Sequence, residues 1–128
     1  MVTVTMEQII DFRNGAGFLG EANLPLKAAY KINKLRKNIE NEFEYYSEQF
    51  KKIVDTYARK DENGNILFND DGDQILIEKG KIDECNQALT DLQTLEIEID
   101  NCNLIIDDLG EDLECTPDEL EVVMPFLN

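Results

Sequence analysis

The longest regular pattern in the chain is LKAAYKINKLRKNIENEFEYYSEQFKKIVDTYA, residues 26–58. Large apolar side chains recur in it at steps of three and four residues, which is the period of one face of an α-helix. The stripe comprises Ile32, Leu35, Ile39, Phe43, Tyr46, Phe50, Ile53 and Tyr57. We therefore predict one amphipathic helix from about Leu26 to Ala58, roughly 50 Å long at 1.5 Å per residue.

Short elements are expected before this helix. Val2 and Val4 alternate with threonines, which predicts a strand. Thr5 and Gln8 have the spacing of a capping box, in which each residue satisfies a backbone N–H near the other. A helix is therefore expected to begin near Met6 and to end at the loop 14–17.

The chain after residue 60 is predicted to mix strands and helices. Two apolar triplets, 66–68 and 75–77, flank a turn and predict a β-hairpin. A helix is expected over residues 80–94. Residues 95–99 alternate apolar and acidic side chains, which is typical of a strand with one solvated face.

The motif TPDE at residues 116–119 predicts a short final helix. Threonine is a preferred N-cap, proline suits the first helical position, and the glutamate can complete a capping box. Phe126 and Leu127, which follow this helix, are expected to pack in the core.

Together these elements predict an α+β fold in a single domain, 1–128. One long amphipathic helix and shorter helices are expected to pack with a small antiparallel sheet or hairpin. Residues 1–60 are expected to be mainly helical and are nearly neutral, with ten Lys/Arg and eight Asp/Glu. Residues 61–128 form the acidic α+β part, with two Lys/Arg and twenty Asp/Glu.

The net charge of −16 therefore belongs to the second part of the chain. A field of this sign repels nucleic acids and anionic lipids, and it attracts basic protein surfaces. We expect a protein partner with a basic surface, no direct nucleic-acid binding and no membrane binding. Solubility in a crowded cell is the competing explanation for the acidity.

The residue types of common catalytic sites are sparse. The chain has no His, which removes the usual partner of a nucleophilic Ser or Cys and the commonest metal ligand. The loop that starts at Asp61 lacks the Gly and the bidentate Glu of a calcium loop. Glu96 and Glu98 share one strand face, which we expect to be solvated rather than catalytic. We therefore predict no enzyme, no cofactor and no metal site.

The three cysteines form no CxxC pair: Cys85, Cys102 and Cys115. We expect free thiols that pack as small apolar residues, and a zinc site of three thiolates is the weaker alternative.

A basic stripe of Lys27, Lys31 and Lys34 lies on one face of the long helix. A nucleic-acid stripe would carry more aromatic platforms than Tyr30, so we expect internal charge complementarity or a solvated face.

The segment LPLKAAYKINKLRKNIENEFEYYSEQFKKIVDTYARKDENGN, with LTDLQTLEIEI and TPDELEVVMPFL after it, resembles a family of small uncharacterised proteins from phages and prophages of Gram-positive bacteria. The shared features are a Leu-Pro start to a long helix, a Tyr before an Asp-Glu-x-Gly-Asn turn, a Glu-x-Glu-Ile strand and a Pro-Phe ending. The family has no assigned activity, so the resemblance implies a phage context and a shared fold but no catalytic residues.

Two functional hypotheses follow from these patterns. The first is a phage accessory protein in the host cytoplasm that binds a protein through its acidic surface and inhibits a host nuclease or defence factor, with nucleic-acid mimicry as one mode. The second is a virion component or assembly chaperone that forms homo-oligomers through the 26–58 helix. The densest carboxylates are the candidate partner-binding residues: Asp70, Asp71, Asp73, Asp107, Asp108, Glu111, Asp112 and Glu114.

Overall fold

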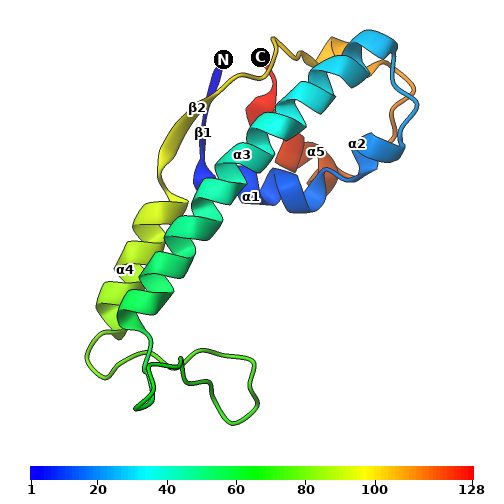
Figure 1. Ribbon diagram of the computed structural model, residues 1–128. Coiled ribbons are helices and arrows are strands. Elements are labelled where there is room, and N and C mark those ends of the chain that lie inside the picture. Colours follow the sequence, from blue (N-terminus) through cyan, green and yellow to red (C-terminus); the bar gives the residue numbers. More distant parts are fainter. The chain divides into compact units, whose positions relative to one another are not determined.

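The computed structural model describes residues 1–128 and has an α+β fold (Figure 1). The elements in chain order are β1 (Val2–Thr5), α1 (Met6–Gly15), α2 (Phe18–Glu21), α3 (Leu26–Tyr57), α4 (Ile82–Gln93), β2 (Glu96–Ile99), the 3₁₀ helix η1 (Ile106–Leu109), α5 (Pro117–Val123) and the 3₁₀ helix η2 (Met124–Phe126). The long helix predicted from the 26–58 pattern is confirmed. The two strands form one antiparallel sheet, β1–β2.

The chain divides into two compact units, which are discontinuous in sequence. Unit 1 comprises Met1–Glu44 and Thr94–Asn128, and unit 2 comprises Tyr45–Gln93. Neither boundary coincides with the division at residue 60 that the charge pattern indicated. The acidic second part of the sequence is therefore shared between the units: unit 1 has six Lys/Arg and seventeen Asp/Glu, and unit 2 has six and eleven.

Unit 1 holds the main core, which lies between the sheet, α1, the first part of α3 and the C-terminal helices. β1 and β2 pair with Val2 opposite Ile99 and Thr5 opposite Glu96. The predicted capping box starts α1, because the Thr5 hydroxyl accepts from the Gln8 N–H and the Gln8 side chain accepts from the Thr5 N–H. The rings of Phe12 and Phe126 pack at 4.8 Å between centroids. Phe126 is fully buried, as predicted, whereas Leu127 is only half-buried.

Unit 2 consists of the second part of α3, a series of turns and α4. The expected hairpin between 66–68 and 75–77 is present only as one isolated antiparallel bridge, Phe68–Ile75, and no regular strand forms. The segment after α3 takes part in this pairing, since Ala58 bridges Ile77 and Lys60 bridges Ile66. Cys85 and Leu92 on α4 are buried as the pattern predicted, but Ile82 on the same predicted face is 56% exposed.

Candidate binding surface

The structure does not bring the eight candidate carboxylates together. Asp70, Asp71 and Asp73 lie in unit 2, in the turn between the two bridged segments, whereas the other five lie in unit 1. One of these turn residues, Asp73, also has a local structural role. The Asn69 amide donates to Asp73 Oδ1 at 2.8 Å, and Asn69 Oδ1 accepts from the Asp73 N–H at 3.1 Å. These bonds hold the turn closed, as Asx turns do.

Asp108 is already engaged inside unit 1. Its Oδ2 lies 2.8 Å from Lys31 Nζ and accepts from the Ile105 N–H at 3.0 Å. These two hydrogen bonds favour the charged carboxylate, and they lower its pKa below the ordinary value of 3.8. The pair confirms internal complementarity for Lys31 and leaves Asp108 less able to contact a partner.

The carboxylates of the remaining candidates in unit 1 form no side-chain hydrogen bond and no ion pair. Asp107 is exposed on η1, and the loop that follows exposes Glu111, Asp112 and Glu114. Asp112 and Glu114 line a shallow hollow that also includes Glu21, so carboxylates from two parts of the chain meet there. No basic residue lines this hollow.

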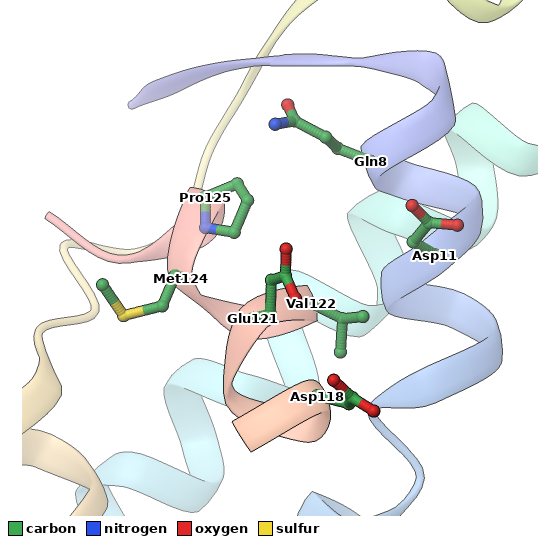
Figure 2. A pocket seen from close by; sticks show the side chains of 7 residues that line it. All are labelled: Gln8, Asp11, Asp118, Glu121, Val122, Met124 and Pro125. Carbon is green, nitrogen blue, oxygen red and sulfur yellow. The ribbon is translucent and has the colours of Figure 1, made fainter. Parts of the chain in front are cut away.

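A second hollow of unit 1 was not anticipated from the sequence. It is a groove of about 750 Å³ between α1 and the C-terminal helices (Figure 2). Two residues of α1, Gln8 and Asp11, face the α5 carboxylates Asp118 and Glu121 across it. Its apolar lining comes from the segment before the C-terminus: Val122, Met124 and Pro125.

The close approach of α1 and α5 positions this groove. A Cβ atom at Gly15 would lie 3.2 Å from a methyl carbon of Val122, which is tighter than an ordinary van der Waals contact. The absence of a side chain at Gly15 therefore lets the two helices pack closely. The two capping boxes predict both helices, but no local pattern in the sequence indicates that α1 and α5 are neighbours.

The other polar features of unit 1 are structural. Asn101 is fully buried and donates from Nδ2 to the Phe126 carbonyl and to Asn128 Oδ1, each at 2.9 Å. It anchors a turn in which Cys102 and Asn103 both have positive φ. Among the lysines of the basic stripe, Lys34 lies 5.1 Å from the centre of the Tyr30 ring, and the neighbouring Tyr30 side chain raises the lysine pKa.

The three thiols are free, with Cys85 buried, Cys102 half-buried and Cys115 exposed. No group of three or more His, Cys, Asp or Glu side chains is arranged to hold a metal ion. None of the helices combines the length and the apolar character that crossing a membrane requires.

Comparisons of the chain with protein-family models, with curated proteins and with solved structures gave no match. The phage context that the sequence resemblance implies therefore stays a prediction.

Proposed function

We propose that this protein is a non-catalytic binding protein whose acidic surface in unit 1 engages a basic surface on a protein partner. The observation that carries the proposal is the composition of residues 94–128, which include eleven Asp/Glu and no Lys/Arg. Nine of the eleven carboxylates are exposed. Only one of the eleven, Asp108, forms an ion pair with the protein's own cations.

Binding of a positively charged surface lowers the electrostatic free energy of an acidic surface of this kind. Closely spaced carboxylates repel one another, and a partner's lysines and arginines relieve that repulsion while they steer the encounter. The same field disfavours nucleic acids and anionic membranes. Following the phage resemblance, we place the protein in the host cytoplasm, where its partner would be a host nuclease or defence factor that normally contacts nucleic-acid phosphates.

Affinity capture from a lysate of a Gram-positive host tests this function. We expect a basic protein to be retained at low ionic strength and released by salt. At 0.1 M salt the screening length is about 10 Å, so the attraction between exposed charges on the two proteins weakens. A bait in which the nine exposed carboxylates of residues 94–128 are replaced by their amides should retain less of the same protein. Failure of the unmodified bait to retain any basic protein at low salt would argue against the proposal.

A second candidate function, self-assembly in a virion or as an assembly chaperone, is favoured by one feature of unit 2. On α3, Tyr45 is 46% exposed and Phe50 is 40% exposed, and the Phe50 ring lies 5.8 Å from that of Tyr46. Tyr46 and Phe50 belong to the apolar stripe of this helix, and the earlier members Ile32, Leu35 and Ile39 are buried. Only the later part is therefore open to another copy. Sedimentation of the wild type and of Phe50→Asp tests this, and the substitution should shift an oligomer to monomer.

A further inference from the structure

We infer that the groove between α1 and α5 is the docking site for a cationic amphipathic segment of a protein partner. This inference rests on the proposed function and adds to it the place and the chemistry of the contact. The occupant would present lysine or arginine to the groove walls and apolar side chains to its floor.

The groove walls carry uncompensated negative charge. Asp11 lies on α1, and Asp118 and Glu121 lie on α5, so carboxylates approach the groove from both sides (Figure 2). All three are exposed, and none of them forms an ion pair or a side-chain hydrogen bond. No Lys or Arg lines the groove. A ligand cation would therefore meet three carboxylates without displacing an internal partner.

The groove also has an apolar floor, and this floor includes an exposed methionine, which the other acidic hollow of unit 1 lacks. Met124 is 50% exposed, and it lines the groove together with Pro125 and Val122. Methionine is flexible and polarisable, so it adapts to apolar side chains of different shapes. An exposed apolar floor within an acidic rim fits a helix or strand that carries both cations and apolar residues, and it fits poly-cations without apolar groups less well.

A binding experiment with two defined probes tests this inference. The first probe is a fluorescent helical peptide of lysine and leucine, roughly four turns long, with its leucines on one face. The second is an oligolysine of equal charge. At low ionic strength we expect the amphipathic peptide to bind about tenfold more tightly than the oligolysine, measured by fluorescence anisotropy, because only it can cover the apolar floor.

Matched variants locate the site. The groove variant Asp11→Asn/Asp118→Asn/Glu121→Gln should weaken peptide binding about tenfold. The control variant Glu111→Gln/Asp112→Asn/Glu114→Gln removes an equal number of charges from unit 1 outside the groove, and it should weaken binding less than about threefold.

A second pair of variants tests the apolar floor. Met124→Ser should weaken peptide binding about threefold without a change of charge. Ile106→Ser, at a residue that is 55% exposed outside the groove, should leave peptide binding unchanged. Circular dichroism confirms that each variant is folded.

The outcomes separate the two proposals. Equal losses in the two charge variants, or equal binding of the two probes, would overturn the groove as the site while the acidic surface remained a binding surface. If the wild type bound neither probe at low ionic strength, both the groove and the proposed function would fail. Tighter binding of the amphipathic peptide than of the oligolysine, with a larger loss in the groove variant than in the control variant, supports both the groove as the site and the proposed function.

Discussion

At the residue scale, the buried side chain of Asn101 joins two segments of unit 1. It is the one buried polar residue, and its amide links the turn at Cys102 and Asn103 to the C-terminal segment. Its Oδ1 also accepts from the Asn103 N–H at 3.3 Å. Left-handed backbone conformations at non-glycine residues are costly, so the turn depends on such bonds.

Replacement of Asn101 by aspartate should destabilise the protein by about 2 kcal/mol. The carboxylate has nearly the same shape but cannot donate, so two acceptors would face it where the amide now donates. Urea unfolding at neutral pH measures the loss. Asn33→Asp is the control, because Asn33 is exposed on α3 and the substitution adds the same charge. Equal stability of the two variants would mean that the buried amide is not a significant anchor.

The Lys31–Asp108 pair should make stability depend on pH. Because the pKa of Asp108 is lower in the folded chain than in the unfolded chain, the carboxylate stabilises the fold above its ordinary pKa of 3.8. That stability is lost as the pH falls through the lowered folded value. Asp108→Asn should therefore lower the melting temperature at pH 7 and flatten its fall between about pH 5 and pH 2. Asp107→Asn is the control, because it removes a neighbouring carboxylate that forms no ion pair. The melting temperature of this variant should fall with pH as that of the wild type does.

At the scale of the elements, local signals at helix ends act as the sequence predicts. The Thr116 hydroxyl accepts from the Glu119 N–H at 3.1 Å, and the Glu119 carboxylate accepts from the Thr116 N–H at 2.9 Å. With Pro117 at the first position, these bonds define the start of α5. The helix has only seven residues, so its cap satisfies a large share of its free N–H groups.

Thr116→Ala should therefore cost about 1 kcal/mol of unfolding free energy. Thr116→Ser keeps the hydroxyl acceptor and should cost much less. Because α5 forms one wall of the groove, hydrogen exchange at the α5 amides should also rise in the alanine variant. A serine variant as unstable as the alanine variant would show that the methyl group matters, rather than the cap.

At the scale of the whole molecule, charge is the dominant feature. The chain has 28 Asp/Glu and 12 Lys/Arg, and only three ion pairs form: Arg13–Glu40, Lys31–Asp108 and Lys81–Glu84. Most carboxylates thus face other carboxylates or solvent. Such self-repulsion destabilises the compact state and favours binding to a cationic partner.

Salt should for this reason stabilise the free protein. Raising NaCl from about 20 mM to about 200 mM shortens the screening length to less than 10 Å, so repulsion weakens and the melting temperature should rise. The gain should shrink near pH 4, where carboxylates begin to take up protons. A melting temperature that fell with salt at pH 7 would mean that the ion pairs outweigh the repulsion.

Much of the secondary structure could be predicted from the sequence because its signals are local. The 26–58 stripe and the capping boxes at Thr5 and Thr116 each act over a few residues, and the helices that they predict are present. The hairpin at 66–77 is less regular than predicted, since its two segments also bond to residues next to Ala58. Competition of this kind depends on the tertiary path of the chain.

The candidate site was only partly predictable. Charge density along the sequence indicated Glu111, Asp112 and Glu114, which the structure leaves exposed. It also indicated Asp108, which pairs with Lys31. Asp11 gave no signal, because it belongs to no run of carboxylates in the sequence and has Arg13 two positions away. It meets the acidic residues of α5 only when α1 packs beside α5.

By itself, the sequence determined the helix periods, the helix starts, the α+β class and the excess of negative charge, because these depend on residue type and short spacings. Only the tertiary structure decided that β1 pairs with β2, that the acidic residues are shared between two units, and that α1 and α5 enclose an acidic groove. The strand pairing and the groove join residues about 90 or more positions apart, and the packing that selects such contacts has no local pattern.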